Sequence, residues 1–298
     1  MTVVAALVST AVFFVLQVLP GDPAYVVAGI DADPAAVARV RSEMGLGRPL
    51  LQQYLEWTVG VARGDFGESL TQRVPVRQLI AQRLPITLRL AGLAFALVVV
   101  GGTALALLAG TSRWARVVVR ATEYLTIATP QFWLGLVLLY IFAFRLNLIA
   151  LFSDGSLRSL LPPALVLSAG SIGIVSRALR AGIEEQRARP HVVAARSYGL
   201  SARRVFWIHV VPGAIGPAVA VLGVIGGYLL AGAIVVEEVF GLAGLGRLAL
   251  TAIAQRDLPL IRGVVFAFGL LFPLLNGLSD LLLQLLDPRQ RTAATVDA

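Results

Sequence analysis

The most prominent pattern in the chain is a series of long apolar runs divided by shorter polar segments. The runs cover residues 2–19, 86–110, 121–144, 160–179, 212–236 and 261–286. A helix needs about 20 apolar residues to cross the hydrocarbon core of a bilayer, and it satisfies its backbone hydrogen bonds within one segment. The pattern therefore predicts an all-α, polytopic membrane protein in which residues 1–298 form one domain with six transmembrane helices.

The first apolar run has an alternative interpretation as a secretory signal peptide. Such a peptide carries a positively charged start and a cleavage site of small residues. This run begins at Met1 without a preceding Arg or Lys, and it ends in Leu19-Pro20-Gly21-Asp22-Pro23. Neither feature is evident, so we expect a retained membrane span.

Arginine residues gather in the connections between alternate spans. They are Arg113, Arg116 and Arg120 after the second span, Arg180, Arg187, Arg189, Arg196, Arg203 and Arg204 after the fourth, and Arg289 and Arg291 in the tail. In a six-span chain these segments share one side of the membrane, and cytoplasmic loops carry the excess of basic residues. We expect both termini to be cytosolic and residues 20–85 to lie on the opposite, extracytoplasmic side.

The segment between the first two spans carries two helix signals of its own. Asp33 and Pro34 are typical of an N-cap and a first helical residue, and a helix from there should end near Gly45 or Gly47. A second amphipathic stretch covers residues 50–62 and contains Tyr54 and Trp57. It is interpreted either as a docking surface for an outer partner or as an interfacial helix held by its aromatic residues.

Composition removes several kinds of chemistry. The chain is 57% hydrophobic and 14% charged, whereas a soluble domain usually carries about 25% charged residues. All basic residues are Arg, so the Lys of a phosphate-binding P-loop is absent, and there is no Cys for a disulfide or thiolate zinc site. His191 and His209 form no HExxH motif, and no GxSxG nucleophile elbow occurs. We expect no enzyme activity, metal site or cofactor in this chain.

Residues 191–212 form the most informative polar segment. Gly199 is a natural helix C-cap and Ser201 can cap a second helix from Ala202 to about residue 210. Small residues Ala194 and Ala195 allow close approach, and Arg196, Arg203 and Arg204 offer charges. A short helix laid into a groove is a common recognition mode, although a solvated basic loop has the same composition. The flanking spans and the placement of Arg in loops argue against nucleic-acid binding, despite the net charge of +8.

This segment resembles the coupling loop of permeases from binding-protein-dependent ATP-binding-cassette importers. The family pattern is Glu-Ala-Ala, three residues, Gly, nine residues and Ile-x-Leu-Pro. Ala194, Ala195, Gly199 and Pro212 fall at these spacings, while Val193, His209 and Val211 depart from it.

Further motifs resemble the dipeptide and oligopeptide branch in order along nearly the whole chain. They are LPGDPA (19–24), MGLGRPLLQQYLEW (44–57), RGDFGESL (63–70), RLPITL (83–88), PQFWLG (130–135), EEVFGLAGLGRLALTAIAQRDLPLIRG (237–263) and DPRQR (287–291). The set is similar to the first of the two permease subunits in such systems.

The resemblance implies a type I importer permease fold in a bacterial inner membrane. The implied partners are a second homologous permease, two ATP-binding subunits that hold ATP and Mg²⁺, and an extracytoplasmic substrate-binding protein. It implies import of dipeptides or oligopeptides, with nickel or glutathione as alternatives. The cytosolic coupling loop is expected at 182–211, and the implied coupling residues are Ala194, Ala195, Arg196, Gly199, Leu200, Ser201 and Pro212.

Polar residues near the spans are candidates for the transport pathway. Glu237 and Glu238 end the fifth span, and they are expected either to meet substrate or to pair with Arg247, Arg256 or Arg262. Asn276 and Asp280 share a face of the last span and are expected either in the pathway or in an interhelical hydrogen bond.

Two features of the spans leave alternatives open. Gly223 and Gly227 form a GxxxG motif for helix packing, either within this chain or with a second permease. Pro130 and Pro273 can kink their spans, although Pro is ordinary in membrane helices. Two other functional classes are alternatives to an ATP-driven importer. An ion-driven secondary transporter would show internal repeats and charges near the membrane midplane, and this sequence shows no clear repeat and few such charges. A non-transporting membrane scaffold is the other alternative.

Overall fold

The computed structural model describes residues 2–17, 22–29, 32–43, 45–146 and 157–286. In these ranges the regular structure is helical, as predicted, apart from one isolated antiparallel bridge between Glu68 and Pro75. The chain forms two compact units, and each combines two stretches of sequence. The first unit holds Met1–Leu88 and Gly241–Leu274, and the second holds Arg89–Phe240 and Leu275–Ala298.

The first unit is built from short helices and parts of two long ones. It contains α1 (Thr2–Gln17), α2 (Pro23–Ala28), α3 (Pro34–Glu43), α4 (Leu50–Ala62), α12 (Leu245–Ala254), the start of α5 (Val76–Leu108) and the first part of α13 (Leu258–Leu286). Its core includes Val12, Val76, Leu245 and Leu260, which come from α1, α5, α12 and α13. Segments far apart in the sequence therefore share one apolar core.

The two helices predicted between the first spans are present. The backbone N–H of Ala35 donates to Asp33 Oδ1 at 3.4 Å, and Gly45 follows α3 with a φ of +66°. Helix α4 covers the predicted residues 50–62. Trp57, however, is buried instead of forming an outer surface, and its Nε1–H donates to the Ser9 carbonyl at 3.4 Å. The aromatic residues of α4 therefore hold α1, as the 2.7 Å hydrogen bond between Tyr54 and Thr10 also indicates.

A buried carboxylate at the start of α13 connects two segments of the first unit by hydrogen bonds. Asp257 is fully buried, and its Oδ2 accepts hydrogen bonds from Ser69 Oγ at 2.6 Å and from Thr71 Oγ1 at 3.0 Å. Its Oδ1 accepts from the Leu260 N–H at 3.2 Å. A carboxylate at this position satisfies a free N–H of the first turn and complements the helix dipole. It also joins the loop before α5 to α13.

The second unit contains the helices that lead to the predicted coupling loop. They are the rest of α5, α6 (Arg113–Ala128), α7 (Gln131–Leu139) with a π-helical turn η1 (Tyr140–Arg145), α8 (Leu157–Arg187), α9 (Pro190–Ser197), α10 (Ala202–Val205), a second π-helical turn η2 (Phe206–Val210), and α11 (Val211–Val239). Helices α8 and α11 lie against one another. A Cβ added at Gly182 would lie 2.6 Å from the Ala214 carbonyl, so only glycine permits this approach.

The number of straight spans differs from the six that hydropathy predicts. Among the described residues, four helices are long and apolar enough to cross a membrane: Val76–Leu108, Ser159–Arg187, Ala202–Val239 and Leu258–Gly277. Helix α1 has 16 residues, or about 24 Å, which is shorter than a hydrocarbon core of about 30 Å. The predicted third span is a bent pair, α6 with α7 and η1, with 102° between its parts.

Pro130 accounts for the break in the third predicted span. Proline lacks a backbone N–H and disfavours the helical region for the residue before it. Thr129 accordingly has φ −83° and ψ 121°, which ends α6, and α7 starts in a new direction. Pro273 lies inside α13 without such a break. The helices α5 and α8 also extend beyond the predicted spans, because polar residues at their ends continue the helix outside the apolar run.

Candidate functional site

Helix α9 is the first half of the predicted coupling segment. Pro190 occupies its first turn, where the missing N–H costs no hydrogen bond, and Arg189 precedes it with extended backbone. Val192 and Ala195 point into the protein and are buried. Val193, Ala194, Arg196 and Tyr198 are exposed. The helix thus has an inner apolar face and an outer face that is available to another protein.

The end of α9 is set by Gly199, as predicted. Gly199 has a φ of +79°, and its N–H donates to the Arg196 carbonyl at 3.0 Å. The N–H of Leu200 reaches back to the Ala195 carbonyl at 3.4 Å. These two bonds form a Schellman motif, which a residue with a side chain at Gly199 would strain. The half-buried Leu200 then turns the chain toward α10.

The second half of the segment differs from the prediction. Ser201 is at the N-cap position of α10, but its side chain makes no capping hydrogen bond. The helix also does not end near residue 210, because α10, η2 and α11 form one continuous helix, Ala202–Val239. The π-helical turn lies just before Pro212, where the N–H of Val211 donates to the Phe206 carbonyl. The ring of Pro212 crowds the carbonyl four residues earlier and removes one N–H, which explains the wider turn.

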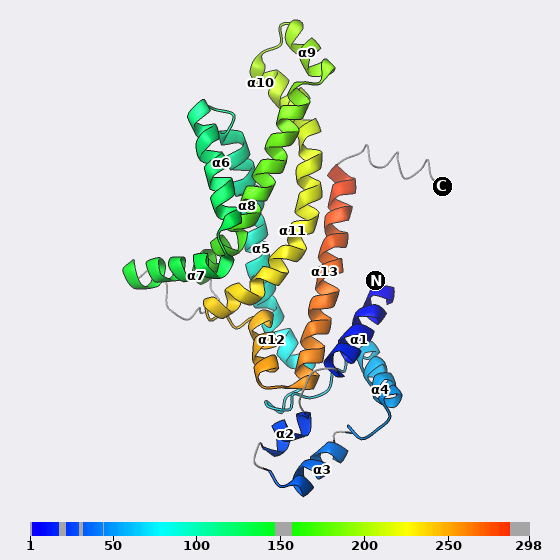
Figure 1. The fold of residues 1–298 in the computed structure, drawn as a ribbon. Coiled ribbons are helices and arrows are strands. Elements are labelled where there is room, and N and C mark those ends of the chain that lie inside the picture. The colour runs from blue at the N-terminus through cyan, green and yellow to red at the C-terminus, as the bar shows by residue number, and fades with distance from the viewer. Residues whose placement is uncertain (1, 18–21, 30–31, 44, 147–156, 287–298) are drawn as a thin grey trace, which may run out of the picture. The chain divides into compact units, whose positions relative to one another are not determined.

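A compact apolar cluster fastens the segment to the membrane helices. It contains Ala106 of α5, Leu179 and Ile183 of α8, Val192 and Ala195 of α9, Val205, Val210, Ala214 and Ala218. Figure 1 shows α9 and α10 at one end of α8 and α11. Closely packed interiors transmit displacement instead of absorbing it. Helix α9 is therefore in direct apolar contact with α8 and α11.

A buried ion pair joins α6 to α8 beside this segment. Glu123 is buried, its Oε2 accepts from an Arg180 guanidinium nitrogen at 2.8 Å, and its Oε1 accepts from Ser176 Oγ at 2.8 Å. Arg180 was predicted to lie in the loop, and Glu123 was not predicted to have a role. An ionisable residue in an apolar run was the available signal.

The predicted pathway residues do not form one cluster on the described surface. Glu237 is fully buried near the end of α11, whereas Glu238 is exposed. The Oδ1 of Asn276 is buried and accepts no hydrogen bond from the described residues. The side chain of Asp280 lies outside the described residues, as does the DPRQR tail. Gly223 and Gly227 are both buried within α11, which favours packing inside this chain.

A groove of about 580 Å³ lies along α7, α8 and α11 in the second unit. Its walls are mainly apolar, and the polar side chains among them are Gln131, Ser171 and Tyr228. Tyr228 is exposed, and Gln131 Nε2 donates to the Leu167 carbonyl at 3.5 Å. Sequence reasoning missed this groove, because the three residues come from separate helices.

Comparison with known proteins is consistent with this arrangement. Residues 102–292 match the family described as binding-protein-dependent transport system inner membrane component, and residues 1–91 match its N-terminal region. A Brucella abortus (strain 2308) protein named as a peptide transport system permease is 36% identical, over 97% of this chain and 95% of its own length. The glutathione transport system permease protein GsiC of Escherichia coli (strain K12) is 33% identical, over 96% and 94%.

A solved structure supports the fold. The crystal structure of an amino acid ABC transporter with histidines has a TM-score of 0.54, with 24% identity, over 71% of this chain and 94% of that one. The two family matches together cover almost the whole sequence. The chain therefore belongs to the binding-protein-dependent transport system inner membrane components, and it is a multi-pass permease subunit of an ATP-driven importer that works with ATP-binding subunits and a substrate-binding protein.

Proposed function

We propose that this chain forms half of the translocation pathway of a peptide importer. The observation that carries the proposal is the 36% identity, over nearly the full chain, to a protein named for peptide transport. Glutathione, the substrate named for the 33% identical relatives, is itself a small peptide. Dipeptides or oligopeptides are therefore the proposed substrates, with glutathione as the second candidate.

The proposed assembly contains a second homologous permease, two ATP-binding subunits and one extracytoplasmic binding protein. Both termini of this chain and α9 face the cytosol, as the distribution of Arg favours. ATP and Mg²⁺ are held by the partner subunits, and this chain makes or breaks no bond. Its contribution is a change of conformation, which ATP can drive only if the partners bind the two states with different affinity.

Helix α9 is the proposed contact with an ATP-binding subunit. Val193, Ala194 and Tyr198 supply exposed apolar surface, and Arg196 adds a charge at the edge. Gly199, Leu200 and Ser201 form the turn that presents this face, while Pro212 lies where the segment joins α11. A short helix of this kind fits a groove on its partner.

The groove along α7, α8 and α11 is the proposed wall of the pathway. Polar groups facing lipid near the middle of a bilayer are costly and normally face a protein interior or a water-filled cavity. Gln131, Ser171 and Tyr228 can hydrogen-bond a peptide backbone that has lost its water. The predicted pathway or gate residues remain Glu237, Glu238, Asn276 and Asp280.

Reconstitution in liposomes tests the function. The chain is combined with its second permease, ATP-binding subunits and binding protein, and uptake of labelled dipeptide, longer peptides, glutathione and nickel is followed. Uptake of peptide that requires both ATP and the binding protein is the expected result. Vesicles with catalytically inactive ATP-binding subunits are the control. Uptake driven by an ion gradient without ATP would contradict the proposal.

A further inference from the structure

We propose that a cavity beside the coupling segment binds the phosphate headgroup of an anionic phospholipid. The cavity has a volume of about 320 Å³ and lies within the second unit. It is bounded by the end of α5, the start of α6, the last turns of α8 and the turn η2. Its lining includes Gly110, Arg116, Arg180, Glu184, Arg187 and Trp207.

The lining carries an excess of positive charge. Arg180 is satisfied on one side by Glu123, and its Nε is buried without a hydrogen-bond partner. Arg116 and Arg187 make no ion pair with any residue in the described ranges, and Glu184 is the one carboxylate in the lining, 3.7 Å from Arg180. Two guanidinium groups are therefore free to receive an anion.

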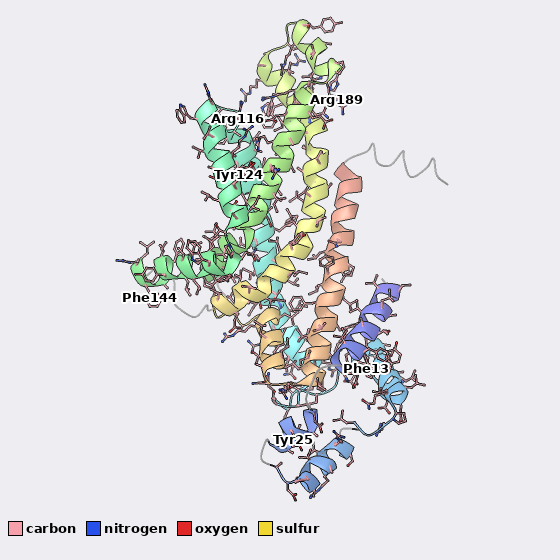
Figure 2. The ribbon with its side chains drawn as sticks, in the orientation of Figure 1. Phe13, Tyr25, Arg116, Tyr124, Phe144 and Arg189 are labelled. Carbon is pink, nitrogen blue, oxygen red and sulfur yellow. The ribbon has the colours of Figure 1, made fainter. Side chains whose placement is uncertain are left out.

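The rest of the wall is apolar and aromatic. Leu107, Ile183 and Phe206 line the cavity, and the guanidinium carbon of Arg187 lies 5.7 Å from the centre of the Phe206 ring. Trp207 is 53% exposed at the cavity, and Trp114 is 79% exposed in the first turn of α6. Figure 2 labels Arg116 near the same end of α6. Tryptophan prefers the level of the headgroups in a membrane.

Charge and apolar surface together define the ligand. Inorganic phosphate would use the arginines but not the apolar wall, whereas a phospholipid uses both. Basic pockets between transmembrane helices on the cytoplasmic side bind anionic headgroups. Arginine suits this role because its guanidinium is planar, always charged and able to contact phosphate with two N–H groups. The inference rests on the proposed orientation, since it places the cavity at the cytosolic leaflet.

Bound lipid would sit between α6 and η2, next to the helices that move with α9. Its phosphate would neutralise Arg116 and Arg187, and one acyl chain would follow Leu107 and Ile183. The site would therefore hold the start of α6 against the coupling segment.

Native mass spectrometry of the assembled importer tests the proposal. The complex is exchanged into detergent containing equal amounts of phosphatidylglycerol and phosphatidylcholine, and bound lipids are counted. The wild-type complex should retain phosphatidylglycerol selectively. The double variant Arg116→Gln/Arg187→Gln should bind it about 30-fold more weakly, from about a factor of five to six for each arginine near a charged headgroup.

Two matched variants keep the result interpretable. Arg113→Gln removes a charge from the same end of α6 but outside the cavity lining, and it should leave lipid retention unchanged. Arg116→Lys/Arg187→Lys keeps both charges but loses the contact through two N–H groups, so it should restore part of the retention, which separates loss of charge from misfolding. Equal loss in Arg113→Gln, or no lysine rescue, would overturn the proposal.

Competitors distinguish the possible occupants. Inorganic phosphate at millimolar concentration should displace little phosphatidylglycerol. Full displacement would mean a phosphate site without lipid specificity and would overturn the proposal. The proposal would also be overturned if the isolated permease pair retained the lipid but lost it once the ATP-binding subunits were added. Lipid counting needs no transport, so a substrate other than peptide would leave this result intact.

Discussion

At the scale of single residues, the turn after α9 depends on one backbone conformation. Gly199 has a φ of +79° in open space, with no heavy atom within 4 Å of an added Cβ. Valine there costs about 1–2 kcal/mol through backbone strain alone. Because the strain acts on the turn, the α9 face should change direction while the membrane helices stay folded.

Gly199→Val should therefore uncouple ATP hydrolysis from transport. Reconstituted vesicles should hydrolyse ATP without stimulation by loaded binding protein, and peptide uptake should fall at least tenfold. Gly64→Val is the matched control, because Gly64 also has positive φ and open space but lies in the other unit. Normal uptake together with normal stimulation in Gly199→Val would show that the turn does not carry coupling.

The Glu123–Arg180 pair belongs to the same scale. Without Glu123, the half-buried Arg180 keeps, among the described residues, only the mostly exposed Glu184 at 3.7 Å, so the loss should be about 3 kcal/mol, the low end of the range for a buried pair. Glu123→Gln should therefore lower the melting temperature of the purified complex far more than Glu185→Gln does. Glu185 pairs with Arg189 on the surface, where both side chains are more than half exposed, and such pairs contribute at most about 1 kcal/mol.

A second variant tests whether the charge itself is the cause. Glu123→Leu/Arg180→Leu removes both charges and should recover much of the stability that Glu123→Gln loses. If the double variant is as unstable as Glu123→Gln, an uncompensated charge on Arg180 is not the cause of the loss.

At the scale of elements, the groove along α7, α8 and α11 makes a prediction about water access. The chain has no native cysteine, so single cysteines can be introduced without background labelling. Cysteine at Tyr228 should react with a membrane-impermeant thiol reagent, and its rate should change at least fivefold between nucleotide-free and ATP-trapped complexes. Cysteine at Val100, an exposed apolar position of α5, is the lipid-facing control and should stay unreactive.

The rate in the two nucleotide states decides the assignment. Equal reactivity of Tyr228→Cys and Val100→Cys would place the groove against lipid and remove it from the pathway. Reactivity of Tyr228→Cys that is high but independent of nucleotide would make the groove a static water pocket.

The sequence predicted elements well where a local signal marks their ends. Helix α3 begins after Asp33 at Pro34 and is followed by Gly45, and helix α9 is ended by Gly199. These ends were predictable because caps and left-handed turns are encoded by the residues that form them. Hydropathy located the long helices but predicted them to be too short, because polar residues such as those near Arg187 continue the helix beyond the apolar run. The break at Pro130 could not be predicted from the proline alone, because Pro273 leaves its helix continuous.

Long-range pairings could not be predicted in the same way. Glu123 and Arg180 are separated by 57 residues, and their contact requires the register of two helices that sequence alone does not provide. The groove along α7, α8 and α11 and the cavity beside the coupling segment could not be predicted for the same reason, because their residues become neighbours only after the helices of the second unit pack.

At the scale of the whole subunit, the continuous helix Ala202–Val239 has a mechanical consequence. Its 38 residues span about 57 Å, nearly twice the thickness of a hydrocarbon core. A continuous helix of that length can act as a lever, with Pro217 within it. If the π-helical turn at Phe206–Val210 serves as its pivot, a tilt of about 5° displaces the far end by roughly 4 Å. In the proposed mechanism, a small tilt at the coupling segment would thus move the far end by less than one helical turn, a distance comparable to the width of an extended peptide backbone.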